Sequence, residues 1–351
     1  MAFLQNCWYL ASWSTELSTK TILARTILEK PIALFRQADG SPAAIQDQCP
    51  HKFAPLSAGT VEGNSIRCRY HGLAFDGRGR CSDNPHGAIT KNIQVTSYPV
   101  VECFRGIWIW MGDPARADIK TIPDLSYLSA APETAFSAGY IHSFGHYELM
   151  TDNIMDLSHT DYLHPGTLGG AGITNTKPEI VETQDYIEQI WFVPKTKPAP
   201  LLASLFPDLP AETDTLQSVR WYAPSVIRLV ASTIATGGSR EEGYRNINAH
   251  VLTPETERTT HYFFAATRNY KAEDGDLNQY LAKAREQIFA TEDKPMIEKI
   301  QRVMANRDFW SMNPVIMPID VVPTRIRRRL RKMIDVEHQD SFRIDDNKWR
   351  Y

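Results

Sequence analysis

The chain reads Cys49-Pro50-His51-Lys52-Phe53-Ala54-Pro55-Leu56 and, further on, Cys68-Arg69-Tyr70-His71-Gly72-Leu73, and these two stretches decide the fold of its first part. Sixteen residues separate His51 from Cys68. Each stretch pairs one cysteine with one histidine, as C-x-H and as C-x2-H. One or two spacer residues let both side chains of a pair converge on a metal while the backbone turns around it. Two such loops on a β scaffold make a four-ligand metal site.

Two kinds of metal centre use two cysteines and two histidines. Structural zinc takes these ligand types, but zinc ribbons and fingers favour halves that are all cysteine or all histidine. Here each half mixes one of each, which is typical of a Rieske [2Fe–2S] cluster, where one iron takes two thiolates and the other two imidazoles. The predicted cluster ligands are Cys49, His51, Cys68 and His71.

The composition is that of an ordinary globular protein. The chain has 351 residues, which predicts about two domains at roughly 150 residues each. Hydrophobic residues make up 42% and charged residues 23%, so disorder and coiled coil are excluded as the main architecture. Lys and Arg number 38 against 41 Asp and Glu, and the resulting net charge of −3 argues against a nucleic-acid partner.

The sequence also bears on location. The first twenty residues lack the basic head and clean hydrophobic stretch of a signal peptide, and no window holds the 18 or so apolar residues of a membrane-spanning helix. Five cysteines, an odd number, argue against a disulfide framework. We therefore expect a cytoplasmic protein without a membrane partner.

The hydrophobic pattern changes near Gly112. Before it, short strand-like runs such as residues 32–35 and 107–110 alternate with turn residues. After it come longer strands and two helical patterns, at residues 147–160 and from about Leu277, with Pro295 as a break or kink. The predicted class is α+β: an all-β Rieske domain (1–112), then a catalytic domain (113–351) with an antiparallel sheet covered by helices, helix-grip-like.

A second metal site is predicted in that later part. His159 and His164 are five residues apart, which on a straight helix separates them by roughly 140°. The helix must therefore distort or end between them, and His164 precedes Pro165, where the α conformation is disfavoured. Glu292 and Asp293 offer a carboxylate. Two imidazoles and one carboxylate leave three positions open for O2, water and substrate, as in non-haem Fe(II) oxygenases.

The two cysteine–histidine stretches resemble the Rieske motif of bacterial Rieske non-haem iron oxygenases, and within that family the vanillate O-demethylase and dicamba monooxygenase group. One departure is Lys52, where the group usually has Arg. By this resemblance His159, His164 and Asp293 match the mononuclear iron ligands, with Asp293 favoured over Glu292, and Asn153 matches a residue close to the iron in some members.

The resemblance also implies how the two centres cooperate. Asp156 lies three residues before His159, where an acid can fix the ring of a metal-bound histidine. In related oxygenases this Asp bridges a Rieske histidine of one subunit to an iron histidine of its neighbour in a head-to-tail homotrimer. The implied electron route is His71, Asp156, His159.

The implied activity is that of the oxygenase component of a monooxygenase in aromatic compound catabolism, an oxidative demethylase. Electrons from NADH or NADPH would come through a separate flavin and iron–sulfur reductase or a ferredoxin, because the chain lacks a dinucleotide fingerprint. With O2 as co-substrate, a methoxylated aromatic acid would lose its methyl group as formaldehyde. His250 and Arg228 are candidate substrate contacts on predicted strands, although a structural role suits each of them equally well.

Two other functions remain open from the residues alone. The same metals could perform N-demethylation, methyl hydroxylation or ring hydroxylation of another aromatic compound. A Rieske electron carrier without a catalytic iron is the alternative of another class, although the long second domain argues against it. The basic run 325–332 is interpreted as a solvated helix face in preference to a docking site for an acidic reductase or another subunit.

Overall fold

The structure is a computed structural model that describes residues 3–169, 172–239 and 242–348. The chain forms two compact units, one made of Phe3–Asp124 with Thr253–Thr256, the other of Leu125–Leu252 with the residues from Glu257 onward. The expected domain boundary at Gly112 lies before this division, because residues 113–124 belong with the first unit.

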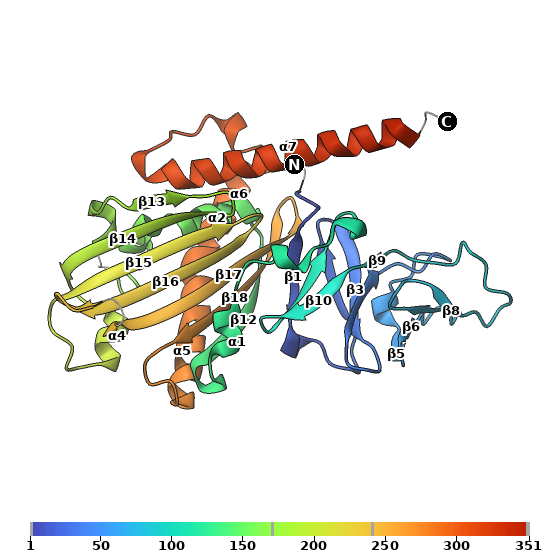
Figure 1. Cartoon of the computed structure of the whole chain (residues 1–351), viewed down its shortest axis with the longest axis horizontal. Helices are drawn as coiled ribbons and strands as arrows, with labels where there is room; N and C mark the ends of the chain where they lie inside the picture. Colours follow the sequence, from blue (N-terminus) through green and yellow to red (C-terminus); the bar gives the residue numbers. More distant parts are fainter. Residues whose placement is uncertain (1–2, 170–171, 240–241, 349–351) are drawn as a thin grey trace. The chain divides into compact units, whose positions relative to one another are not determined.

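The first unit is built from strands, as expected from the short alternating runs (Figure 1). One sheet has the order β1-β11-β10, a second β2-β3-β4-β9, and a third β5-β6-β7-β8. The strands are β1 Trp8–Trp13, β2 Leu23–Ile27, β3 Lys30–Arg36, β4 Pro42–Gln46, β5 Thr60–Glu62, β6 Ser65–Arg67, β7 Ala74–Asp76, β8 Cys81–Asp83, β9 Ser97–Tyr98, β10 Val100–Cys103 and β11 Gly106–Trp110. Short 3-10 turns are η1 Ser14–Glu16, η2 Leu56–Ala58, η3 Pro114–Arg116 and η4 Ile119–Thr121.

The second unit contains a seven-stranded sheet in the order β12-β18-β17-β16-β15-β14-β13. Its strands are β12 Phe136–Ser143, β13 Glu179–Glu182, β14 Tyr186–Thr196, β15 Thr213–Tyr222, β16 Val226–Ala235, β17 Tyr244–Thr256 and β18 Thr259–Arg268. Neighbours such as β14 and β15, or β15 and β16, pair antiparallel. The predicted fold class is thereby confirmed.

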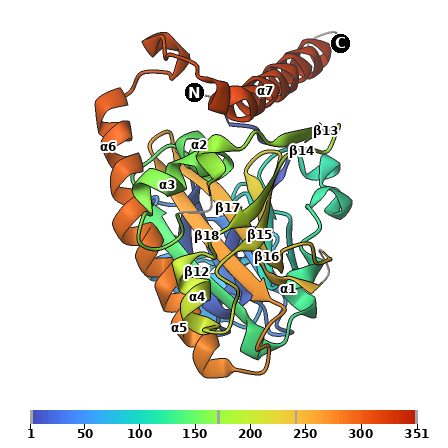
Figure 2. The same ribbon diagram turned by 90° about the vertical axis from the view of Figure 1, so that its left-hand side faces the viewer.

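Helices cover one face of this sheet (Figure 2). The helices of the second unit are α1 Ser126–Ala130, α2 Tyr147–Met155, α3 Thr160–Leu163, α4 Pro200–Leu205, α5 Gly275–Ile288, α6 Lys294–Met304 and α7 Val321–Lys348, and α3, α4, α5 and α6 are the ones seen on that face. Shorter 3-10 turns are η5 Glu133–Ala135, η6 Leu157–His159, η7 Ile173–Asn175, η10 Trp310–Met312 and η11 Pro318–Asp320. None of the helices within the described residues combines the length and apolar character that crossing a membrane requires.

The late helix departs from its prediction at Pro295. No break occurs there, because α5 continues through a π-helical turn, η9 Phe289–Asp293, directly into α6. Pro295 lies in the first turn of α6, where a proline ring is tolerated. The irregularity that Pro295 was expected to cause therefore lies in the residues before it, and those residues include Asp293.

The basic run 325–332 lies in α7 and is not simply a solvated face. Arg327 is buried, and its guanidinium donates to Glu148 and Asp152 of α2 at 2.6 and 2.7 Å. Arg325 and Arg329 both pair with Glu182 of β13. The expectation of a solvated face is therefore corrected for the buried Arg327 and the half-buried Arg329, whereas Arg325 is exposed as expected.

Candidate metal centres and substrate cavity

The two cysteine–histidine loops have the same backbone geometry. The Cys49 N–H donates to the Ala54 carbonyl at 2.8 Å, and the Cys49 carbonyl accepts from the Phe53 N–H at 2.9 Å. In the second loop Cys68 makes the equivalent bonds with Leu73 and Gly72, at 2.8 and 3.0 Å. Both Phe53 and Gly72 have positive φ, 61° and 80°, at the same position of the loop. One turn type, used twice, therefore presents both ligand pairs.

The four side chains of these loops gather as two like pairs. Cys49 and Cys68 are both 2% exposed, and burial, followed by the neighbouring Cys68 thiol, raises the pKa of Cys49. The rings of His51 and His71 lie edge to face with centroids 4.5 Å apart. The His71 Nδ1 is buried without a hydrogen-bond partner in the described part of the chain. Thiols on one side and imidazoles on the other fit a two-iron cluster better than a single ion.

A second group lies in the other unit, where three side chains come within range of one ion. Among the described residues, it is the one set of three or more His, Cys, Asp or Glu whose ligand atoms all lie within 4.8 Å of one another: His159, His164 and Asp293. The two Nε2 atoms lie 3.3 and 3.1 Å from the same Asp293 oxygen, Oδ1.

Irregular backbone brings these three residues together. His159 ends the 3-10 turn η6, and His164 caps the single-turn helix α3 just before Pro165, so the helix does change between them as expected. Asp293 ends the π turn η9. Such π turns often occur at functional sites, because the extra residue redirects a side chain.

Each histidine ring is held through its other nitrogen. The Nδ1 of His164 lies 2.5 Å from Glu292 Oε2, and the Nδ1 of His159 contacts the main-chain carbonyl of Asp156. With a metal bound, this pattern would keep the ring proton on Nδ1 of both histidines and leave both Nε2 lone pairs for the ion. The expected contact of His159 with the Asp156 carboxylate is thus replaced by one with its carbonyl oxygen.

The charges of the group are matched. Burial raises the pKa of Asp293, but hydrogen bonds from His159 and His164 outweigh it and hold that pKa well below its usual range. Burial lowers the pKa of His164, but Asp293 and Glu292 outweigh it and raise the pKa. Asn153 Nδ2 also donates to Asp293 Oδ1, at 3.1 Å. The predicted Asn153 therefore joins the three residues, and Glu292, which the sequence offered only as an alternative ligand, supports His164.

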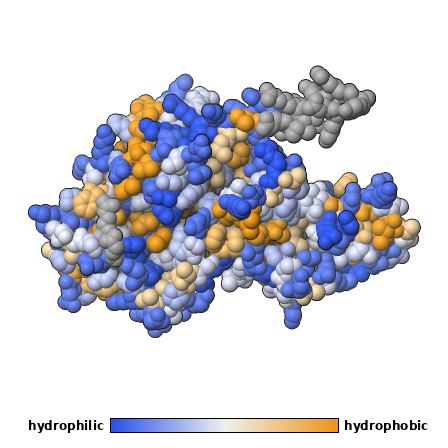
Figure 3. All heavy atoms as spheres, in the orientation of Figure 1, coloured by the Kyte–Doolittle hydropathy of each residue, from blue (hydrophilic) through white to orange (hydrophobic). Residues whose placement is uncertain are grey.

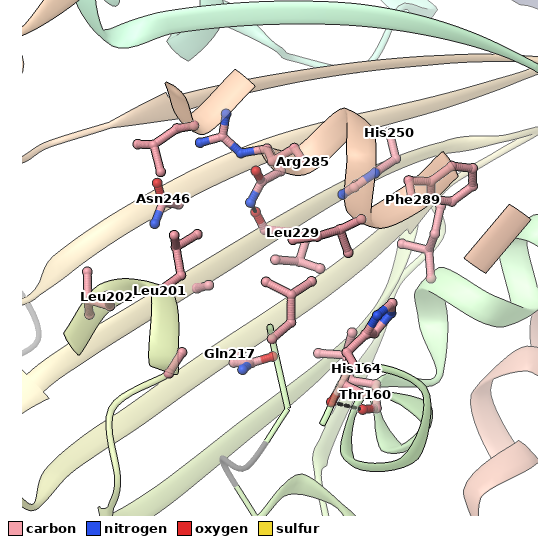
Figure 4. Close-up of a pocket in the computed structure, with 18 of the residues that line it drawn as sticks. Thr160, His164, Leu201, Leu202, Gln217, Leu229, Asn246, His250, Arg285 and Phe289 are labelled. Atoms are coloured by element: carbon pink, nitrogen blue, oxygen red, sulfur yellow. Dashed lines mark hydrogen bonds between the residues drawn. The ribbon is translucent and has the colours of Figure 1, made fainter. Parts of the chain in front are cut away.

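The three residues open onto a cavity of about 270 Å³ between the sheet and the helices (Figure 4). Its walls are mainly apolar, with Leu201 and Leu202 from α4, Leu229 from β16 and Phe289 from η9. A few polar side chains also line it: Gln217, Asn246, Asn248, His250 and Arg285. Such a mixture is typical of a small-molecule site.

Of the two expected substrate contacts, one lines the cavity and the other does not. His250 lines the cavity, with its Nε2 buried and without a hydrogen-bond partner in the described residues. Arg228 does not line it, because it alternates with the cavity residue Leu229 along β16 and so points to the opposite face of the sheet. There its guanidinium lies 3.6 Å from Glu188. The prediction of a substrate contact for Arg228 is corrected accordingly.

Comparison with known proteins follows the same division of the chain. Residues 7–99 match the Rieske [2Fe-2S] domain model. Residues 145–336 match the model of the vanillate O-demethylase oxygenase C-terminal domain. The chain belongs to the Rieske non-haem iron oxygenases. The cysteine–histidine loops lie within the first match, and the His159, His164 and Asp293 group lies within the second.

Its similar relatives within this oxygenase family carry out different dealkylations. The oxygenase component of chloroacetanilide N-alkylformylase from Rhizorhabdus wittichii is 36% identical, over 95% of this chain and 97% of its own. The oxygenase component of dicamba O-demethylase from Stenotrophomonas maltophilia is also 36% identical, over 96% and 99%. The crystal structure of dicamba monooxygenase bound to 3,6-dichlorosalicylic acid superimposes with a TM-score of 0.90 at 35% identity, covering 96% of this chain and 99% of that one.

The chain is therefore the oxygenase component of a Rieske monooxygenase system. It carries a Rieske [2Fe-2S] domain, and an oxygenase component implies a separate reductase or ferredoxin that supplies electrons. The match of the second unit to an oxygenase domain removes the alternative of a simple electron carrier.

Proposed function

We propose that the chain O-demethylates a methoxylated aromatic acid and releases formaldehyde. The observation that carries this proposal is the group of His159, His164 and Asp293 at the wall of a small, mainly apolar cavity. A cavity of about 270 Å³ lies near the lower end of ligand-site volumes and suits a single aromatic ring.

In this proposal Cys49, His51, Cys68 and His71 hold the Rieske cluster. His159, His164 and Asp293 hold the mononuclear iron. When bound, the cluster supplies single electrons and the iron activates dioxygen for attack on a C–H bond. The two imidazole nitrogens and the carboxylate of Asp293 would suit Fe(II) as a ligand set.

The remaining residues bind and orient the substrate. Leucines of α4 and β16 exclude water from the ring, and Phe289 adds an aromatic wall beside Asp293. Burial lowers the pKa of His250 to about 4, so its ring is neutral near pH 7. Its Nδ1 lies 2.6 Å from the Tyr262 hydroxyl, whose pKa burial raises, and the phenol therefore donates. The His250 Nε2–H is then free to donate to a substrate oxygen.

The reaction balances with the co-substrates of the family. Hydroxylation of the methyl carbon of an aryl methoxy group gives a hemiacetal, which collapses to a phenol and formaldehyde. One atom of O2 enters the product and the other leaves as water. Two electrons from NAD(P)H, delivered by the separate reductase, and two protons complete the balance.

A second candidate is N-dealkylation of a neutral anilide. It is favoured by the 36% identity to an N-alkylformylase component, which equals the identity to dicamba O-demethylase. Only the substrate differs between the two candidates, because the metal-binding residues and the electron supply would be the same.

The test is a substrate panel with the metal-loaded protein, a surrogate reductase and NADH. The panel contains methoxybenzoates, their methoxybenzamide counterparts, N-alkyl anilides and benzoates without a methoxy group. We expect formaldehyde, with matching O2 uptake and a phenol product, from one or more methoxybenzoates. Formaldehyde from neutral substrates alone, or O2 uptake without formaldehyde, would contradict the proposal.

A further inference from the structure

One charged side chain faces the apolar cavity without a counter-charge. Arg285 of α5 lines the cavity, and the Ser137 hydroxyl, 2.9 Å from its Nη1, is its one hydrogen-bond partner among the described residues. No carboxylate of the described chain lies within 4.0 Å of its guanidinium, whereas Arg220, Arg327 and Arg329 each pair with one. The other guanidinium donors of Arg285 are available to a ligand.

A partly buried cation without a counter-charge is costly to maintain. Burial lowers the pKa of Arg285 to about 10, so the group stays protonated near pH 7, and nearby Arg268 adds positive potential. Buried charges in proteins are ordinarily paired, because an unpaired charge loses its hydration without compensation. Arg327 of the same chain shows the ordinary solution, with two carboxylates bound to one buried guanidinium. Arg285 lacks such partners and faces the substrate space.

The position of Arg285 along the helix relates it to the metal-binding group. Arg285 and Asp293 are eight residues apart, a rise of roughly 12 Å and a rotation offset of roughly 80° on an ideal α-helix. The π turn Phe289–Asp293 has a smaller rotation per residue, which brings Asp293 back toward the face that carries Arg285. In Figure 4, Arg285 and Asn246 are seen on one side of the cavity and His164 on the other.

Neutral polar groups line the same cavity. Asn246 accepts a hydrogen bond from the Tyr270 hydroxyl at 3.2 Å through Oδ1. Its amide N–H groups are therefore the part of the side chain that can donate to an anion. The buried Nε2 of His250 has no partner in the described residues. A cation with neighbouring neutral donors is the composition of a carboxylate or sulfonate site.

We propose that Arg285 is the anion anchor of the cavity and selects single-ring aromatic acids over neutral aromatic compounds. The anionic group binds at Arg285, and the opposite end of the ring is thereby directed toward His159, His164 and Asp293. This inference rests on the proposed function for its reaction, but binding of the anion requires no turnover. It assigns to Arg285 the role that the sequence had suggested for Arg228.

The experiment measures binding calorimetrically with the intact, metal-loaded protein under anaerobic conditions without reductase. The probes are benzoate and benzamide, which share a shape and differ in charge. We expect benzoate to bind the wild type at least about tenfold more tightly than benzamide, because a charge-assisted bidentate contact to Arg285 is lost in the amide. Arg285→Gln should weaken benzoate binding about tenfold or more and leave benzamide binding within about twofold.

Matched variants separate charge at this position from charge in general. Arg285→Lys keeps the cation and should retain part of the preference for benzoate. Arg228→Gln removes an arginine from the opposite face of the sheet and should leave both affinities unchanged. Far-ultraviolet circular dichroism and the visible spectrum of the cluster report whether each variant is folded and loaded.

Two results would overturn the inference: wild-type protein that binds benzoate no better than benzamide, or Arg285→Gln protein that keeps the full preference. If Arg285→Gln fails to fold, the wild-type ratio and the Arg285→Lys variant still decide the question. Charge-selective binding without formaldehyde in the substrate panel would refute the proposed demethylation and leave the anion anchor standing.

Discussion

Asp156 contacts its surroundings through two different groups. Its carboxylate Oδ1 accepts from the Ser158 N–H at 3.0 Å and the Ser158 hydroxyl at 2.7 Å, and so caps the turn η6. Its main-chain carbonyl contacts the His159 ring. Because the backbone orients His159, the negative charge of Asp156 is not needed for that purpose. The charge is then available for the proposed electron route through His71, Asp156 and His159.

Replacing Asp156 by Asn separates these roles. Asn caps helical turns as well as Asp does, so η6 should be preserved, along with the backbone contact to His159. We expect Asp156→Asn protein to contain both metal centres in wild-type amounts and to lose turnover by at least about a hundredfold. Iron analysis, cluster absorption and formaldehyde release measure the three quantities.

Asp118→Asn is the matched control, because Asp118 caps the exposed turn η4 through the same kind of contact, to the Lys120 N–H. This variant should keep wild-type activity. Near-normal turnover of Asp156→Asn would eliminate the route through Asp156. Loss of the mononuclear iron in that variant would show a structural role instead.

At this scale the sequence was informative where chemistry constrains spacing. The cysteine–histidine pairs were predicted because metal chelation requires such residue types at such short spacings. The set of His159, His164 and Asp293 followed from the family resemblance, because Asp293 is far from the two histidines in sequence, and the structure brings the three together. The prediction that Arg228 contacts the substrate was wrong, because side chains alternate between the two faces of a β-strand and the sequence alone does not say which face lines the cavity. Arg285 carried a signal that was missed: it shares one helical face with Leu281 and Ile288, an arginine on an apolar stripe.

Helix α2 begins at a buried titratable group. His146 is 4% exposed and serves as its N-cap, with Nδ1 accepting from the Glu148 N–H at 3.4 Å and its own N–H donating to Gln301 at 2.8 Å. Burial, assisted by the positive charge of Arg327, lowers the pKa of His146 to about 3. The ring is therefore neutral in the folded chain at every physiological pH.

This cap predicts an acid-sensitive contribution to stability. Above pH 6.5 the ring is neutral in both states, whereas between pH 6.5 and about 3 only the unfolded chain takes up a proton. Stability should thus fall as pH falls, by about 2 kcal/mol between pH 7 and pH 5 from this group alone. In His146→Asn protein the cap is kept and the titration removed, so its urea unfolding should lose about 2 kcal/mol less than wild type over that range. Equal pH dependence in both proteins would contradict the assignment.

At the scale of helices and strands, the hydrophobic pattern of the sequence predicted some elements and missed others. The strand-like runs 32–35 and 107–110 were predicted close to the observed bounds of β3 and β11. The π turn was not, because it arises from tertiary constraints around Asp293 and has no residue signature of its own. The basic run was misread for a similar reason: Arg327 is buried by the acids of α2, which lie far away in sequence.

At the scale of the molecule, the two sets of metal-binding residues belong to different compact units. Exposed aromatic residues adjoin both: Phe53 and Tyr70 in the cysteine–histidine loops are 69% and 61% exposed, and Tyr162 between the two iron-site histidines is 77% exposed. Apolar patches also interrupt the otherwise polar face in Figure 3. Exposed aromatic residues at such places are typical of protein–protein contacts. They support the proposed head-to-tail homotrimer, in which the loops of one subunit meet the iron site of the next. The cytoplasmic location stays a prediction.

Hybrid oligomers test whether electrons cross between chains. His71→Ala should remove the cluster, and Asp293→Ala should remove one iron per chain while the cluster absorption remains, so each variant alone should be inactive. Co-expressed in equal amounts with different tags, the two should form hybrids in which a cluster-bearing chain adjoins an iron-bearing one. In a head-to-tail ring about one interface in four has both intact partners, one half times one half, so we expect about a quarter of wild-type turnover. Transfer within a single chain predicts no turnover, because no chain holds both centres.

Co-expression of wild type with the double variant is the complementary experiment. Here transfer between chains predicts about a quarter of wild-type turnover, and transfer within one chain predicts about a half. A hybrid without activity, together with the half value in the second mixture, would refute the trimeric route.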